Sequence, residues 1–180
     1  MEKLKQALRD LWEKARHGFR PESDEAWTPL ASTVSGTSEV LFICTGNYYR
    51  SRFAEALFNH NAIEAELPWR AFSRGVAIHL ASSDLSPYTR EALEARGIDL
   101  RMTGPTRAPL QEEDLRRAKR RIALKRTEHE RYIEEQFPDW NDRVEYWEIH
   151  DLDVAPPDEA LPLLEQAVLR LLREIQRENV

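Results

Sequence analysis

The stretch VLFICTGNYYRSRFAEALF, residues 40–58, decides the expected fold. Its first five residues are apolar, β-branched or aromatic without polar alternation, which predicts a strand buried on both faces, as in a parallel sheet. A helical pattern follows at residues 51–62, so a short polar loop joins this strand to a helix. In open parallel sheets, ligands bind beyond the carboxyl ends of the strands. Cys44 stands at that end of the first strand.

The remaining chain alternates between strand and helix patterns. Further strands are expected at residues 69–78 (interrupted by Gly75), 121–125 and 143–150, and further helices at residues 86–97, 110–120, 127–137 and 158–179. Ser86 and Thr127 are expected as helix N-caps, with Pro87 as a first helical residue and Gly97 at a helix end. This alternation predicts an α/β fold of three layers, α/β/α, around a central parallel sheet of about four strands with right-handed crossovers.

Composition narrows the class of protein. The 180 residues, 41% of them hydrophobic, suffice for one domain with a core. No apolar run approaches the ~20 residues of a membrane span, and the charged first twenty residues are not expected to be a secretory leader. A single cysteine allows no internal disulfide, and the net charge of −6 is unlike that of a nucleic-acid polycation. We therefore expect a cytoplasmic protein without a membrane or nucleic-acid partner.

The first 38 residues are expected to be a helical extension with a linker, and residues 39–180 to be the main domain. Residues 2–17 carry Leu4, Leu8, Leu11 and Ala15 on one face of a predicted amphipathic helix. Packing against its own domain is the expected role of this helix, with a membrane or partner contact as the alternative. The polar residues 21–38 are expected to be irregular.

The loop from Cys44 to Ser51 has the residue types of an anion site. It wraps the N-terminus of a helix, where unpaired amides and a partial positive charge attract anions. Gly46 and Asn47 tolerate the positive φ that a tight loop needs. Arg50 can bind two phosphate oxygens at once, and the positive potential favours a thiolate at Cys44. A lone cysteine is usually a small buried hydrophobe, but the whole combination favours a phosphate site with an activated nucleophile.

Residues 40–58 resemble the signature of the low-molecular-weight protein tyrosine phosphatases, with a buried strand, a C-x5-R-S loop and an Ala-Glu helix. FSRGV, EALEARGIDL and LQEEDLRRAKRRIALKRTEHERYI resemble later parts of that family, so the likeness runs from Glu39 to the C-terminus. The resemblance implies that Cys44 attacks phosphorus to form a phosphocysteine and that Arg50 and the loop amides hold the phosphate. The residues that it places around the substrate are Thr45, Gly46, Asn47, Tyr48, Tyr49 and Ser51.

The resemblance also implies a general acid, an Asp beyond the last strand. The family has Asp-Pro there, whereas this chain reads YWEIHDLDVAPPDEA. Asp151, two residues after Ile149, is the preferred candidate, and Asp153 is the alternative. Asp158 is expected to begin the last helix instead, where a carboxylate favours the helix dipole.

Three positions depart from the family pattern. Tyr49 replaces a frequent second cysteine, and with one cysteine the chain lacks the relay of arsenate reductases. Tyr48 is large, which argues against phosphoarginine; it either stacks on a substrate ring or packs against a neighbouring loop. Lys125 follows Leu124 where the family commonly has an acid, and we expect it to make the rim of the site more basic.

These residues predict hydrolysis of phosphate monoesters, from a phosphotyrosine protein or a small aryl phosphate, with inorganic phosphate as product. The alternative is a non-catalytic phosphate-binding or regulatory module on the same scaffold. No metal-ligand motif is present, so neither a metal nor another cofactor is expected. His129 and His150 are interpreted as surface or structural residues. The basic run RRAKRRIALKR, residues 116–126, is interpreted as a solvated face balanced by neighbouring acids.

Overall fold

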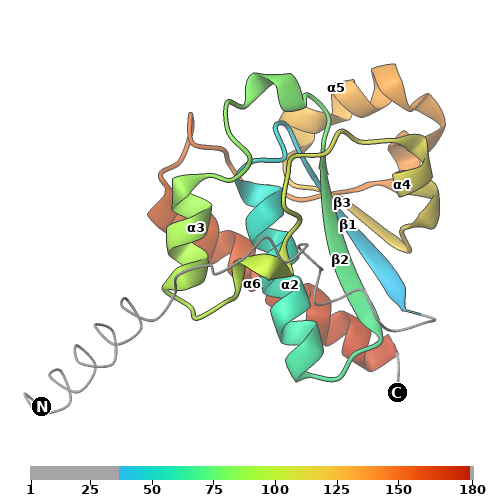
Figure 1. The fold of residues 1–180 in the computed structure, drawn as a ribbon. Helices are drawn as coiled ribbons and strands as arrows, with labels where there is room; N and C mark the ends of the chain where they lie inside the picture. The colour runs from blue at the N-terminus through green and yellow to red at the C-terminus, as the bar shows by residue number, and fades with distance from the viewer. Residues whose placement is uncertain (1–36, 179–180) are drawn as a thin grey trace, which may run out of the picture.

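The computed structural model describes residues 37–178, and the predicted helix at residues 2–17 lies outside them. Four parallel strands form one sheet in the order β2-β1-β3-β4 (Figure 1). The strands are β1 (Ser38–Cys44), β2 (Trp69–Gly75), β3 (Arg120–Ala123) and β4 (Glu145–Tyr146). The first strand is central, so its carboxyl end, which carries Cys44, lies in the middle of one edge of the sheet.

Helices cover both faces of the sheet, which confirms the predicted α/β/α layers. One layer contains α2 (Arg50–Glu64), α3 (Pro87–Glu94) and α6 (Pro157–Glu178), and the other contains α4 (Glu112–Arg117) and α5 (Arg126–Gln136). Short 3-10 helices occur at η1 (Ile78–Leu80), η2 (Leu100–Met102) and η3 (Pro138–Arg143). No helix within residues 37–178 is long and apolar enough to cross a membrane.

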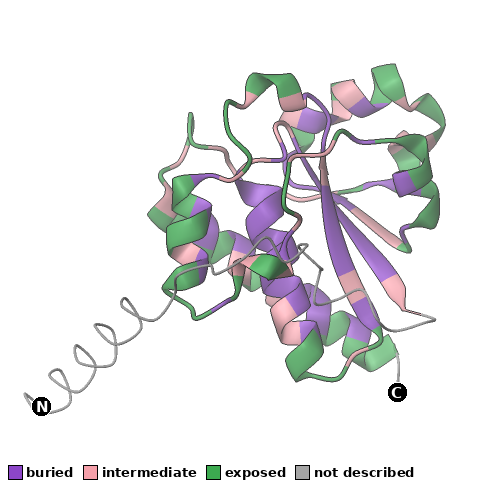
Figure 2. Ribbon diagram, in the orientation of Figure 1, coloured by how far each residue is buried: buried purple, intermediate pink, exposed green. Residues whose placement is uncertain are grey.

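The core explains why the first strand is apolar throughout. Val40 and Phe42 belong to the cluster packed with α2 and α6, while Leu41 and Ile43 belong to the cluster on the opposite face. All four side chains are fully buried, and Figure 2 shows the same for most of β1 and for the first turns of α2. Burial on both faces is what a central parallel strand requires.

Several predicted boundaries are wrong. Helix α4 ends at Arg117 rather than at residue 120, because Ala118 is extended and leads the chain into β3. Helix α5 begins at Arg126 with Lys125 as its N-cap, so Thr127 is not the cap. Strand β4 spans two residues instead of the predicted 143–150. Beyond it, the amides of Trp147 and Ile149 still bond to the carbonyls of β3 and its extension before the chain leaves the sheet.

Gly75 ends β2 as predicted, and the loop after β1 supplies the reason. A Cβ atom at this position would lie 2.8 Å from the carbonyl oxygen of Thr45 and 2.9 Å from the amide nitrogen of Asn47. Only glycine therefore lets the loop pass this close to the end of β2. Ser86 and Pro87 are the N-cap and first residue of α3, as predicted, although the Ser86 side chain makes no capping bond.

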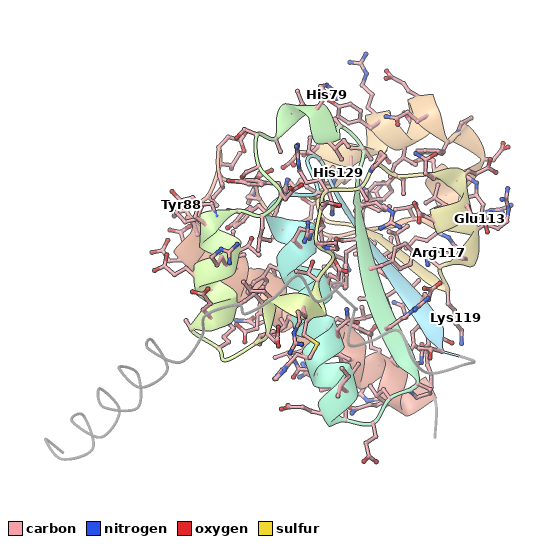
Figure 3. All side chains as sticks on the ribbon, in the orientation of Figure 1. His79, Tyr88, Glu113, Arg117, Lys119 and His129 are labelled. Atoms are coloured by element: carbon pink, nitrogen blue, oxygen red, sulfur yellow. The ribbon has the colours of Figure 1, made fainter. Side chains whose placement is uncertain are left out.

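Most cations of the basic run 116–126 pair with acids, as expected for a solvated face. Figure 3 shows Glu113, Arg117 and Lys119 along the α4 side of the molecule. Arg117 forms salt bridges with Glu39 and Asp114, and Arg116 pairs with Glu113. These carboxylate partners offset much of the positive charge of the run.

Candidate active site

The loop after β1 presents unpaired backbone amides. Cys44 ends the strand with 3% of its surface exposed, and α2 begins at Arg50. Within residues 37–178, none of the amides from Thr45 to Tyr49 donates a hydrogen bond to a backbone or side-chain acceptor. Tyr49, the N-cap, provides no side-chain cap, and the first turn of α2 contains no acid. These donors and the helix dipole are therefore available to an anion.

Asn47 sets the shape of this loop. Its φ of 49° is left-handed, as predicted for this position. Its side-chain Oδ1 accepts the Ala108 amide at 2.8 Å, and its Nδ2 donates to Ser51 Oγ at 3.1 Å and to Ser73 Oγ at 2.8 Å. Gly46 does not have the predicted positive φ. Its glycine is needed for packing instead, because a Cβ there would lie 3.0 Å from Cβ of Ala81.

The thiol of Cys44 receives a directed hydrogen bond. Its Sγ lies 2.9 Å from Ser51 Oγ, and either atom is a possible donor by distance alone. Ser51 Oγ already accepts a hydrogen from Asn47, so its own hydrogen is free to point at the sulfur. A hydroxyl donor placed in this way stabilises a thiolate, both as nucleophile and as leaving group.

A buried carboxylate anchors this chain of hydrogen bonds from behind. Ser73 donates to Glu55 Oε2 at 2.6 Å, and Thr103 and the Gly104 amide donate to the same carboxylate. Burial raises the pKa of Glu55, while the nearby Arg52 and these donors lower it by a smaller amount. In its ionised form Glu55 only accepts, and this form fixes the direction of the bonds from Ser73 back to Cys44. The sequence had marked Glu55 only as part of the Ala-Glu helix.

Arg50 is fully buried beside the loop and held by three groups. Its Nη1 and Nη2 donate to the two carboxylate oxygens of Glu128 at 3.3 and 2.6 Å. Nη1 also donates to the Ile149 carbonyl at 2.7 Å, and Nη2 to Asp151 Oδ2 at 2.5 Å. Burial alone lowers the pKa of Arg50, but the Glu128 hydrogen bond and the charge of Asp151 together raise it above its usual value.

Glu128 is the functional residue that the sequence analysis missed. The acid expected directly after the third strand is replaced there by Lys125, and Glu128 reaches Arg50 from the first turn of α5. A search for an acid in the first turn of the helix that follows this strand would have found it. We expected Lys125 to make the rim of the site more basic, and this expectation is wrong. It is 9% exposed, and its Nζ pairs with Glu148 at 2.5 Å.

His129 is a structural residue, and the alternative of a surface position is wrong because it is fully buried (Figure 3). Its Nδ1 accepts the Lys125 amide at 3.0 Å, so the neutral ring carries its hydrogen on Nε2. Nε2 lies 3.3 Å from Thr45 Oγ1 and donates to it. Burial, followed by the charge of Arg50, lowers the pKa of His129 to about 3.

A cavity of about 250 Å³ opens over the loop and brings most of the predicted residues together. The predicted residues in its lining are Cys44, Thr45, Gly46, Tyr48, Tyr49, Arg50 and Asp151. Asn47 and Ser51 lie behind this wall, bonded to each other. Asp153 is exposed and does not line the cavity, and Asp158 lies in the first turn of α6, as predicted.

Tyr49 has a buried hydroxyl without a hydrogen-bond partner. Burial, followed by the charge of Asp151, raises the pKa of Tyr49 to about 12. The side chain therefore remains a neutral phenol at physiological pH, where the family often has a thiol. Because Cys44 is the single cysteine of the chain, this wall of the cavity has no second thiol that could form a disulfide with it.

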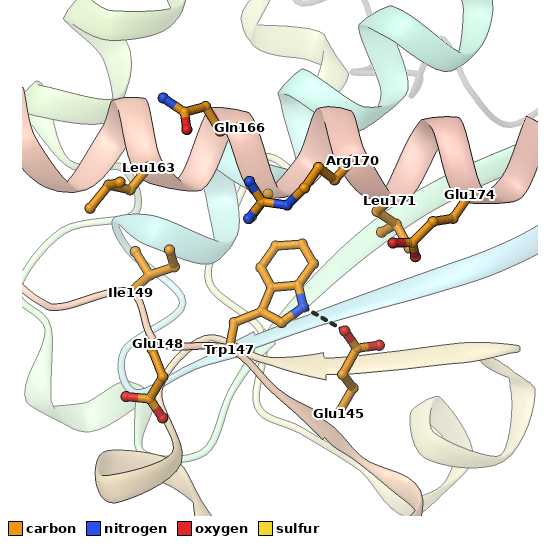
Figure 4. A pocket seen from close by; sticks show the side chains of 10 residues that line it. Glu145, Trp147, Glu148, Ile149, Leu163, Gln166, Arg170, Leu171 and Glu174 are labelled. Atoms are coloured by element: carbon orange, nitrogen blue, oxygen red, sulfur yellow. Dashed lines mark hydrogen bonds between the residues drawn. The ribbon is translucent and has the colours of Figure 1, made fainter.

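A larger hollow of about 400 Å³ lies elsewhere, between α6 and the segment that follows β4 (Figure 4). Trp147 and Arg170 face one another across it, and Trp147 Nε1 donates to Glu145 at 2.7 Å. None of the predicted site residues lines this hollow. The described residues also contain no group of three or more His, Cys, Asp or Glu side chains suited to a metal ion.

A sequence profile described as low molecular weight phosphotyrosine protein phosphatase matches residues 39–180. The chain belongs to this family. No curated protein matches it significantly. Among solved structures, the low molecular weight protein tyrosine phosphatase of T. tengcongensis is similar at 27% identity, with a TM-score of 0.65, over 77% of this chain and 99% of that one.

Two further solved structures widen the comparison. The YwlE arginine phosphatase of Geobacillus stearothermophilus is 26% identical, with a TM-score of 0.63, over 78% of this chain and 94% of that one. YfkJ of Bacillus subtilis is 23% identical, with a TM-score of 0.70, over 81% of this chain and 99% of that one, and supports the fold alone. The protein is thus a cysteine-dependent phosphatase that releases phosphate from a phosphorylated substrate. Its relatives include both tyrosine and arginine phosphatases.

Proposed function

We propose that this phosphatase hydrolyses aryl phosphates, with phosphotyrosine in proteins as the main substrate, through a phosphocysteine on Cys44. The observation that supports this most directly is that Cys44, Arg50 and Asp151 line a single cavity, with a hydroxyl donor 2.9 Å from the sulfur. Phosphoryl transfer needs mainly positioning and charge stabilisation. The unpaired amides and the Arg50 guanidinium provide both.

In the proposed first step, the Cys44 thiolate attacks phosphorus, and a sulfur–phosphorus bond forms as the bond to the ester oxygen breaks. Asp151 donates its proton to that leaving oxygen. In the second step, Asp151 takes a proton from water, which attacks phosphorus and releases inorganic phosphate. The Cys44 sulfur leaves as a thiolate and again accepts the hydrogen of Ser51.

The walls of the cavity favour an aromatic substrate. Tyr48 and Leu80 both line the cavity, and Leu80 has 63% of its surface exposed. A phenyl ring gains apolar contact with such side chains, whereas a guanidinium would lose hydration against them. This supports phosphotyrosine over phosphoarginine.

The test compares two peptides of one sequence that carry either phosphotyrosine or phosphoarginine. Wild-type protein is expected to hydrolyse the phosphotyrosine peptide with the higher kcat/KM, and Cys44→Ser to hydrolyse neither. Preference for phosphoarginine would contradict the substrate assignment. Phosphate binding without turnover in pure wild-type protein would instead favour a non-catalytic phosphate-binding or regulatory module.

A further inference from the structure

The hydrogen bonds of Arg50 leave one edge of its guanidinium incompletely satisfied. A guanidinium has five N–H groups, one on Nε and two on each Nη. Four of them are used, because Nη1 and Nη2 bind Glu128 along one edge, Nη1 binds the Ile149 carbonyl and Nη2 binds Asp151. The Nε–H is buried and has no partner. This is an unsatisfied charged donor in a protein interior.

The unsatisfied edge is the one that a phosphate needs. Nε and the outer hydrogen of Nη2 point the same way and form a fork for two oxygens of one anion. Asp151 occupies the Nη2 half of that fork at 2.5 Å, and the Nε half has no hydrogen-bond partner. Glu128 occupies the opposite edge and the Ile149 carbonyl the remaining hydrogen, so neither blocks an anion at the fork. Arg50 and Asp151 line the same cavity as Cys44.

We infer that Asp151 is an internal competitor for the phosphate position of Arg50. A phosphate that binds both Nε and Nη2 must displace the Asp151 carboxylate, while Glu128 keeps the guanidinium oriented. Displacement also frees Asp151, one third exposed, to turn towards the leaving oxygen. The inference rests on the proposed function only in taking the loop after β1 as the phosphate position.

Binding of inorganic phosphate, measured by calorimetry at neutral pH, tests this contact without any turnover. Asp151→Asn is expected to lower the Kd for phosphate at least about tenfold, because an ionic hydrogen bond no longer opposes binding. Asp151→Ala, which cannot accept a hydrogen at all, is expected to lower it at least as much. Asp153→Asn removes the same charge two residues away without touching Arg50, so it measures the general electrostatic effect.

The two Asp151 variants must bind phosphate more tightly than Asp153→Asn does. An equal or weaker affinity in both would overturn the inference, because Asp151 would then not compete for the fork. Failure of the proposed function would look different. Wild-type protein would show no aryl phosphatase turnover, while the order of phosphate affinities among these variants would stay as expected.

Discussion

Arg50 and Arg52 stand two residues apart in the first turn of α2, and both are buried, yet their surroundings are opposite in kind. Arg50 is held mainly by the carboxylates of Glu128 and Asp151. Arg52 donates to the Thr103 hydroxyl at 2.7 Å and to the carbonyls of Asp84 and Gly104. The pKa of Arg52 is lowered by burial, which the charge of Glu55, 3.9 Å away, offsets only in part. The pKa of Arg50 is raised.

The difference separates the arginine that we propose binds phosphate from a structural one. A carboxylate at a cavity wall can be exchanged for another anion, and Asp151 is partly exposed there. Backbone carbonyls cannot be exchanged in this way, so Arg52 ties the segments at residues 84 and 104 to α2. The C-x5-R-S spacing identifies Arg50, but nothing in the motif RSR indicates what the second arginine, Arg52, contacts.

The largest expected effect comes from replacing each arginine by lysine. Arg50→Lys should lower kcat/KM for p-nitrophenyl phosphate about 10³-fold, because an ammonium cannot fill the bidentate fork at the phosphate. Arg52→Lys should leave kcat/KM within about threefold but lower the free energy of unfolding by about 2 kcal/mol, since buried acceptors lose their donors. Comparable losses of activity in two fully folded variants would erase the distinction.

The carboxylate partner of Arg50 gives the next effect. Asp151→Asn should lower kcat about 10²-fold for phenyl phosphate and much less for p-nitrophenyl phosphate, because a good leaving group needs little protonation. Asp153→Asn, a control with the same charge change, should keep both rates near wild type. If the leaving-group dependence appears in Asp153→Asn instead, the general acid lies two residues further along the chain.

The smallest effect concerns His129, whose pKa is held at about 3 by burial and by the charge of Arg50. Below its unfolded pKa of about 6.5, the unfolded chain binds a proton that the folded protein excludes. His129 should therefore reduce the free energy of unfolding as pH falls, by up to about 1.4 kcal/mol per pH unit. Urea unfolding from about pH 7 to about pH 5 should give a flatter pH dependence for His129→Gln. Equal slopes would show that this histidine is protonated in the folded protein.

Much of the fold follows from local pattern in the sequence. The unbroken apolar run predicts a buried strand, and the proline predicts the start of α3, from neighbouring residues alone. Gly75 differs, because the distant loop after β1 is what requires a glycine there. The boundaries that failed, at α4, α5 and β4, depend on hydrogen bonds to distant strands. Lys119, for example, leaves the helix because its amide bonds to the Glu39 carbonyl of β1. Such pairing has no local signal.

For the site, the sequence by itself determined the loop: Cys44, the left-handed Asn47 and Arg50 follow from residue types within one turn of chain. Only the tertiary structure decided what surrounds them. Glu128 and Asp151 come to Arg50 from residues 78 and 101 positions away, because parallel strands bring their carboxyl ends to one edge of the sheet. A buried arginine needs carboxylate partners, and the fold brings them to that edge from positions that the spacing along the chain does not reveal.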